Sequence, residues 1–236
     1  YKKALVIGSE HITWLLDWSD RGTAVLFGDG AGAVVLEEST DETEGEIYSF
    51  VNGLSSEKLE ILEVPNFGSA MDRFKPDEAA KIKWTFEGPE IFKSGVRAMS
   101  NASKEVVQKS GLNEEDIDIV IPHQANLRII EGLEKSLSFP NSKMIKKVQR
   151  YGNTSAASIP LALVDAIEEG EIKGGETAIF TAVGAGLSWG ACALKLKNDL
   201  TPKNTSDAKL PEFDGTAVDT IMKAIKYQIP EKLEQL

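Results

Sequence analysis

An apolar run that ends at a proline and is followed at once by a histidine limits the folds open to this chain more than any other feature. Residues 117–121 (Ile-Asp-Ile-Val-Ile) predict a buried strand, which Pro122 ends. Apolar residues then recur at helical spacing: Leu127, Ile130, Leu133 and Leu137. His123 therefore lies where a strand passes into a helix. In open α/β sheets that carboxyl edge is where ligands bind.

Strands and helices are predicted in alternation along the chain, which indicates a layered α/β fold. Apolar stretches predict strands at 4–8, 23–27, 45–51, 177–183 and 189–197, and helices at 88–110 and 153–170. Residues 28–32 (Gly-Asp-Gly-Ala-Gly) suggest a nucleotide-binding loop, but such a loop must open a helix and this one precedes a strand. We therefore expect a tight connection between strands, whose glycines permit unusual dihedral angles.

The remaining segments predict surface structure. Residues 40–44 form an acidic turn, and residues 53–84 are expected to run irregularly over one face, because Pro65, Gly68 and Pro76 interrupt them. Polar residues 198–214 predict a linker. Residues 217–225 predict a tail helix, which either packs on its own domain or docks a partner; we expect the first.

Composition excludes several classes of function. A formal charge of −11 over 236 residues disfavours general nucleic-acid binding, because the surface repels phosphates. No apolar run is long enough to cross a bilayer. Cys192 is the only cysteine and His11 and His123 the only histidines, so we expect neither an internal disulfide nor a zinc site. A reducing cytoplasm is the simplest compartment.

Several short motifs occur in an order that is similar to one known family. They are Asp-Arg-Gly-Thr at 20–23, Phe-Gly-Asp-Gly-Ala-Gly at 27–32, His-Gln-Ala-Asn-Leu-Arg at 123–128, Gly-Asn-Thr-Ser-Ala-Ala-Ser at 152–158 and Trp-Gly at 189–190. Together they resemble β-ketoacyl-acyl carrier protein synthase III of the thiolase-like superfamily, from about residue 3 to residue 197.

The resemblance implies a layered α-β-α-β-α fold built from two similar halves. On this comparison residues 1–50 hold the closing strands of the first half, 51–87 a connecting excursion, 88–197 the complete second half, and 198–236 a linker and tail helix. The start of the first half, with the nucleophilic cysteine of the family, has no counterpart here. We therefore expect a complementary segment or chain to supply the thiol, and a dimer of complete folds.

The resemblance also implies a reaction and a catalytic pair. An acyl group passes from coenzyme A to the cysteine, malonyl-acyl carrier protein then binds, and decarboxylation yields the carbanion that attacks the acyl group. His123 and Asn153 match the residues that hydrogen-bond the malonyl thioester oxygen, where negative charge develops. A neutral imidazole and an amide both donate without adding an acid. Coenzyme A thioesters are substrates, and no resident cofactor is expected.

Further positions carry expectations from the same resemblance. The backbone N–H of Ala185 is expected to hold the acyl-thioester oxygen; the family commonly has glycine there, and phenylalanine where this chain has Val183. The substrate channel is expected to include Gly88, Phe92, Ala125, Asn126 and Val183. Carrier-protein docking is expected at Lys93, Arg128 and Lys135.

Three alternatives stay open on the sequence. Cys192 could be the nucleophile, but it lies within an apolar strand, where a free cysteine behaves as a small hydrophobic residue. The chain could be a non-catalytic subunit that kept the fold, although such a subunit has no need of both His123 and Asn153. It could also transfer acyl groups to another acceptor in secondary metabolism.

Overall fold

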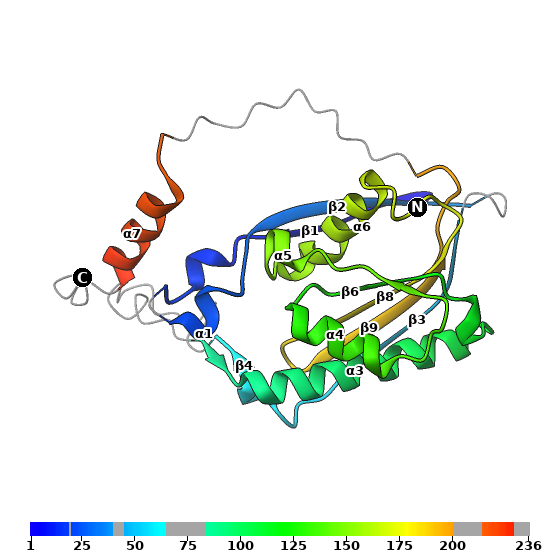
Figure 1. The fold of residues 1–236 in the computed structure, drawn as a ribbon, viewed down its shortest axis with the longest axis horizontal. Helices are drawn as coiled ribbons and strands as arrows, with labels where there is room; N and C mark the ends of the chain where they lie inside the picture. Colours follow the sequence, from blue (N-terminus) through cyan, green and yellow to red (C-terminus); the bar gives the residue numbers. More distant parts are fainter. Residues whose placement is uncertain (19, 40–44, 65–83, 201–213, 229–236) are drawn as a thin grey trace.

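A computed structural model describes residues 1–18, 20–39, 45–64, 84–200 and 214–228 (Figure 1). Its central sheet has five strands in the order β3-β9-β8-β6-β7. Their bounds are β3 Glu46–Leu54, β9 Ser188–Lys195, β8 Thr177–Gly184, β6 Ile119–Pro122 and β7 Lys143–Met144. β6 is parallel to both of its neighbours, whereas β8, β9 and β3 pair antiparallel.

Helices cover the two faces of this sheet. α3 (Gly88–Lys109) and α4 (Leu127–Ser136) pack side by side on one face, and α6 (Ser158–Glu168) lies on the other (Figure 1). Beyond α6 lies a second, antiparallel sheet of β1 (Lys3–Glu10) and β2 (Gly30–Glu37). All four residues of β6 are buried, since helices cover the strand on both faces, and this explains its uninterrupted apolar sequence.

Short elements connect these layers. They are η1 Thr13–Leu15, α1 Arg21–Ala24, η3 Leu59–Ile61, β4 Leu62–Glu63, β5 Thr85–Phe86, η5 Glu114–Asp116, α5 Val148–Tyr151, η6 Ser155–Ala157 and the tail helix α7 Ala217–Gln228. The tail helix is present where the sequence predicts it. Its Val218 and Met222 are 66% and 40% exposed, so the expected packing on its own domain is not seen for these two side chains.

The strand predicted at 23–27 is wrong. The structure has the helical turn α1 there, followed by a single bridge between Phe27 and Asn153. The cause is Asp20, whose carboxylate accepts the Gly22 N–H at 2.8 Å and so caps the turn. The local apolar pattern could not reveal this capping contact.

The glycines at 28–32 serve close packing rather than unusual dihedral angles. Gly30 and Gly32 belong to β2, and neither has a positive φ. A Cβ on Gly32 would lie 2.6 Å from Pro160 Cβ, and one on Gly30 would lie 2.9 Å from Leu161 Cδ1. These glycines therefore let α6 lie directly against β2, and this packing brings residues 152–158 next to the β1–β2 sheet.

The helix predicted at 153–170 begins only at Ser158. Asn153 instead accepts the Ser155 N–H through its side chain at 2.9 Å, and Ser155 has a φ of 49°. Pro160 lies in the first turn of α6, where a missing N–H costs no intrahelical bond.

The helix predicted at 88–110 and its closing glycine are confirmed, with a φ of 70° at Gly111.

No helix among the described residues is long and apolar enough to cross a membrane. The acidic turn predicted at 40–44 lies outside the described residues. The same holds for residues 65–83 of the predicted excursion and for residues 201–213 of the predicted linker.

Candidate functional site

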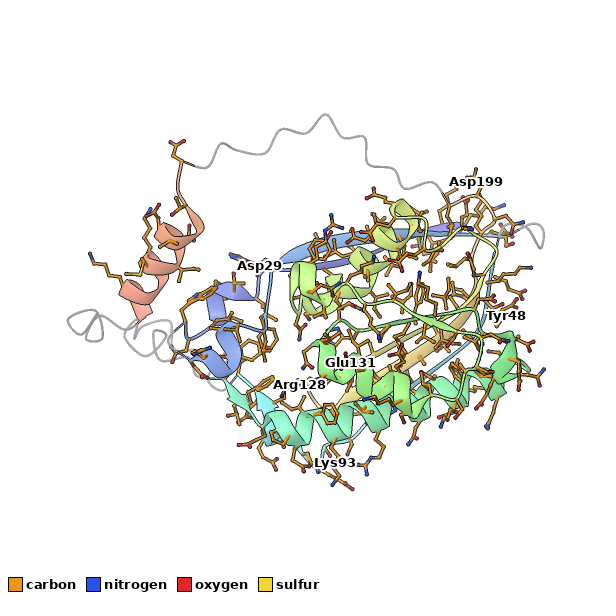
Figure 2. The ribbon with its side chains drawn as sticks, viewed as in Figure 1. Asp29, Tyr48, Lys93, Arg128, Glu131 and Asp199 are labelled. Carbon is orange, nitrogen blue, oxygen red and sulfur yellow. The ribbon has the colours of Figure 1, made fainter. Side chains whose placement is uncertain are left out.

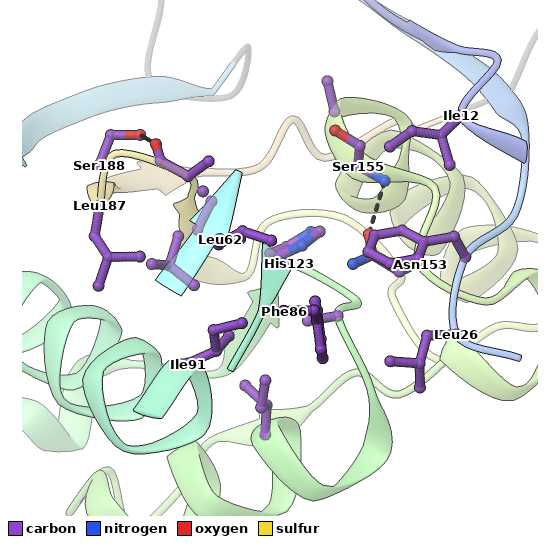
Figure 3. Close-up of a pocket in the computed structure, with 18 of the residues that line it drawn as sticks. Ile12, Leu26, Leu62, Phe86, Ile91, His123, Asn153, Ser155, Leu187 and Ser188 are labelled. Carbon is purple, nitrogen blue, oxygen red and sulfur yellow. Dashed lines mark hydrogen bonds between the residues drawn. The ribbon is translucent and has the colours of Figure 1, made fainter. Parts of the chain in front are cut away.

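A cavity of about 480 Å³ opens at the carboxyl end of β6 (Figure 3). His123 and Asn153 both line it, although they come from different layers of the fold. Most of its wall is apolar and aromatic: Ile12, Leu26, Phe27, Leu62, Trp84, Phe86 and Ile91. Such a cavity suits an apolar ligand with a few polar groups that fix its orientation.

His123 is held where β6 ends. Its backbone N–H donates to the Thr181 carbonyl at 2.7 Å, which continues the pairing of β6 with β8 by one residue. Its Nδ1 lies 2.7 Å from the Ser158 hydroxyl oxygen. Burial lowers the pKa of His123 from 6.5 to about 4, so the imidazole is neutral at physiological pH. A neutral ring can donate one hydrogen bond without introducing a positive charge.

This depressed pKa makes stability depend on pH. Between pH 6.5 and 4, His123 is protonated in the unfolded chain but not in the folded chain. The unfolded state therefore binds more protons, and the free energy of unfolding decreases as the pH is lowered. We expect the wild type to lose up to about 3 kcal/mol more than His123→Gln over this range. Urea unfolding at pH 7, 6, 5 and 4.5 measures the difference. His11→Gln, which removes a 76% exposed side chain, should keep the wild-type dependence; parallel curves for wild type and His123→Gln would contradict the prediction.

The backbone of Asn153 is held by hydrogen bonds to a segment more than 120 residues earlier in the chain. Its N–H donates to the Leu26 carbonyl at 2.8 Å, and its carbonyl accepts the Gly28 N–H at 3.0 Å. Its side-chain Oδ1 accepts the Ser155 N–H at 2.9 Å (Figure 3). No described residue accepts from its Nδ2, so the amide NH₂ is the part of the side chain free to donate to a ligand.

Gly28 is the residue with the least space around its Cα in the segment that holds Asn153. A Cβ at Gly28 would lie 2.1 Å from the Tyr151 carbonyl oxygen, a backbone atom that cannot move without shifting Asn153. We expect Gly28→Ala to lower the free energy of unfolding by about 2 kcal/mol. Gly88→Ala is the matched control, since its Cβ would meet only Phe86 Cε1 at 3.6 Å. Thermal unfolding compares the two variants. Equal melting temperatures would show that the backbone around Gly28 shifts to accommodate the added Cβ at little cost.

Gln124 locks the turn that carries His123. It is 2% exposed. Its Nε2 donates to the carbonyls of Pro122 at 2.7 Å and Ile145 at 3.2 Å, while its Oε1 accepts the N–H groups of Lys147 at 2.7 Å and Val148 at 3.1 Å. The motifs of the sequence predict no role for this residue. A glutamine directly after a buried strand is the signal that could have found it, because a buried amide must be fully hydrogen-bonded.

Four of the expected channel and loop residues line the cavity: Ala125, Asn126, Val183 and Ala185. Gly88 and Phe92 are not among its lining residues. Phe92 is 40% exposed and its ring lies against Gly132 of α4. Asn126 also caps α4, since its Oδ1 accepts the Ile129 N–H at 2.9 Å. In the loop of residues 184–187 the positive φ falls on Gly186, at 136°, so Ala185 accommodates its Cβ.

The aromatic wall of the cavity is not predicted by the sequence. The rings of Phe27 and Trp84 lie 4.7 Å apart, and those of Phe27 and Phe86 6.2 Å apart edge to face. Trp84 Nε1 donates to the Leu15 carbonyl at 3.0 Å, which fixes the indole. These residues are 57 and 59 positions apart in sequence, so no local pattern links them.

The other predicted site residues lie outside the cavity. Lys93, Arg128 and Lys135 are exposed, and Figure 2 shows Lys93 on the outer side of α3 and Arg128 near the start of α4. Cys192 is half-buried on β9, where burial raises the pKa of its thiol, and it does not line the cavity. Among the described residues no group of His, Cys, Asp and Glu side chains could hold a metal ion.

The layered fold and its structural neighbours place this chain in the thiolase-like class. The crystal structure of 3-oxoacyl-[acyl-carrier-protein] synthase III from Aquifex aeolicus is 42% identical with a TM-score of 0.72, over 82% of this chain and 58% of that chain. The enzyme from Pseudomonas aeruginosa is 33% identical with a TM-score of 0.75, over 85% of this chain and 60% of that chain.

The sequence comparisons name the family. Residues 1–54 match the profile "3-Oxoacyl-[acyl-carrier-protein (ACP)] synthase III", and residues 107–196 match the profile of its C-terminal part, together more than half of the chain. The chain belongs to this family. A relative from Vibrio cholerae, "Beta-ketoacyl-[acyl-carrier-protein] synthase III 2", is 47% identical over 229 residues. That alignment covers 96% of this chain and 62% of the relative's length.

Proposed function

We propose that this chain supplies the decarboxylating half of a site that condenses acyl-coenzyme A with malonyl-acyl carrier protein in fatty acid or polyketide synthesis. One observation carries the proposal: His123 and Asn153 line the same cavity, the Nδ1 of His123 lies against the Ser158 hydroxyl, and the Oδ1 of Asn153 accepts the Ser155 N–H. Two donors thus remain for one ligand oxygen. As carbon dioxide leaves, negative charge develops on the malonyl thioester oxygen, and prepositioned donors stabilise it.

The reaction also needs a thiol nucleophile, which we assign to polypeptide outside these 236 residues. The only cysteine of the sequence, Cys192, does not line the cavity, and burial raises its thiol pKa, whereas a nucleophilic thiol needs a lowered one. The chain spans 62% of the Vibrio cholerae relative's length. The remaining length of such enzymes is enough for a segment that carries the thiol. The complete enzyme is proposed to be a dimer of such completed folds.

Exposed apolar side chains support a complementary segment. On β3, Phe50 is 66% and Leu54 is 72% exposed; on β1 and β2, Ile7 and Val35 are 61% and 63% exposed. Burying such residues stabilises a fold by about 1.5–3 kcal/mol each. The proposed segment covers these strands and delivers its thiol to the cavity.

The carrier protein is proposed to dock beside the cavity mouth. Asn126 lines the cavity, and exposed Arg128 follows two residues later. Lys93 and Lys135 add positive charge on the neighbouring surfaces of α3 and α4, in a chain whose net charge is −11. A local basic patch attracts an acidic partner that the rest of the surface repels. The substrates are coenzyme A and carrier-protein thioesters, and the proposed reaction uses no resident cofactor.

Intact-mass analysis of the complete enzyme tests the proposal. After incubation with an acyl-coenzyme A, a thiol outside residues 1–236 should carry one acyl group, and malonyl-acyl carrier protein should remove it. Cys192→Ser is the matched control and should take up the acyl group unchanged. Acylation of Cys192 would refute the assignment of the nucleophile. No acylation of a folded enzyme would favour a non-catalytic subunit.

A further inference from the structure

One buried hydroxyl contacts the ring of His123. Ser158 is the first residue of α6 and is 2% exposed. Its Oγ lies 2.7 Å from His123 Nδ1, and the Gln124 N–H donates to the same oxygen at 3.3 Å. The hydroxyl is therefore held between a ring nitrogen and a backbone donor. Ser158 belongs to the motif at 152–158, but the sequence alone predicts no role for it.

The direction of the hydrogen bond follows from the partners of this hydroxyl. A serine hydroxyl has one proton to donate and two lone pairs that accept. The Gln124 N–H occupies a lone pair, and among the described residues Nδ1 is the one acceptor that Ser158 Oγ contacts. Because burial keeps His123 neutral, with a pKa of about 4, the ring has a single N–H. The arrangement that uses every group is donation from Ser158 to Nδ1, with the ring proton on Nε2.

We propose that Ser158 is a positioning residue that holds neutral His123 in the tautomer with its proton on Nε2. In that tautomer the ring offers a donor to the cavity. In the other tautomer Nδ1–H would point at Ser158, and the lone pair of Nε2 would repel an oxygen that gains negative charge. The inference rests on the proposed function only where it gives the Nε2 proton a catalytic use.

Asn153 is oriented by the same kind of contact. Its Oδ1 accepts the Ser155 N–H, which fixes the orientation of the amide and leaves its NH₂ to donate to the cavity. Residues 152–158 thus hold Asn153 itself, Ser155, which occupies its acceptor, and Ser158, which occupies the acceptor of His123. One short segment of the chain thus sets both the orientation of the Asn153 amide and the tautomer of His123, so that each offers an N–H to the cavity.

The tautomer can be observed directly. In the complete enzyme labelled with ¹⁵N-histidine, long-range ¹H–¹⁵N spectra distinguish Nε2–H from Nδ1–H, and His123→Gln identifies the His123 signals by their loss. The wild type should show Nε2–H, and Ser158→Ala should show a mixture of both tautomers, whereas Ser158→Thr, which keeps the hydroxyl, should return to Nε2–H. Wild-type Nδ1–H, or an unchanged pattern in Ser158→Ala, would overturn the proposal. A wild-type Nδ1–H signal would overturn the proposal even if the alanine variant does not fold, and Ser158→Thr then supplies the comparison that keeps the hydroxyl.

Kinetics supply the second readout. Ser158→Ala should lower kcat for condensation by about tenfold through loss of one hydrogen bond, with KM for the acyl donor unchanged. Ser94→Ala is the matched control, because this buried hydroxyl on α3 has no hydrogen-bond partner among the described residues. If the enzyme does not condense acyl groups at all, the proposed function fails, while the tautomer spectrum still decides the role of Ser158.

Discussion

Replacing His123 with alanine is expected to slow condensation by about 10²–10³-fold in kcat. The loss should fall on the step that uses malonyl-acyl carrier protein, because the Nε2–H donor acts on the oxygen whose charge grows as carbon dioxide leaves. Loading of the acyl group onto the thiol does not develop that charge and should continue. Carbon dioxide release and intact-mass analysis of the acyl-enzyme, measured on the same sample, separate the two steps.

Asn153 provides the comparison that makes this result specific. Asn153→Ala should cause a loss of similar size, and the double variant should lose far less than the product of the two single losses, since both donors serve one oxygen. His11→Gln, which changes an exposed ring outside the cavity, should keep full activity. If His123→Ala stopped acyl loading and condensation equally, its donor would act on a different oxygen from the one proposed.

The sequence could predict the parts of the site that depend on local patterns. The run at 117–121 becomes β6 because a strand covered on both faces must be apolar throughout. Of the apolar residues at helical spacing, Ile130 and Leu133 lie on the buried side of α4, whereas Leu127 is 45% exposed. His123 lies between them as expected. The motif resemblance then related His123 to Asn153, and the structure brings both to one cavity.

Contacts between distant segments could not be predicted in this way. The cavity wall pairs Phe27 with Trp84, and the backbone of Asn153 is held by Leu26 and Gly28, yet neither pairing leaves a periodic signal. The wrong strand at 23–27 has a local cause instead, because Asp20 caps a helical turn there. Leu26 and Phe27, which follow this turn, line the cavity, whereas Val25 is 69% exposed. The apolar pattern of such a turn is the same as that of a short strand.

Gln124→Leu is expected to lower the free energy of unfolding by about 3–5 kcal/mol, the largest stability loss of the variants considered. Leucine has similar volume, so packing changes little. It removes four hydrogen bonds at once and leaves two carbonyls and two N–H groups buried without partners. Each such group costs about 1–3 kcal/mol when it stays dry, and water can relieve only part of this cost.

Gln149→Leu separates this effect from the general cost of replacing a glutamine. Gln149 is exposed on α5 and makes one side-chain bond, from Nε2 to the Lys146 carbonyl at 3.1 Å, so its loss should cost no more than about 0.5 kcal/mol. Urea unfolding of both variants at pH 7 gives the comparison. A Gln124→Leu protein as stable as Gln149→Leu would mean that the turn rearranges and finds new partners for its buried groups. His123 would then be held by Ser158 and by the pairing with Thr181 rather than by the rigidity of the turn itself.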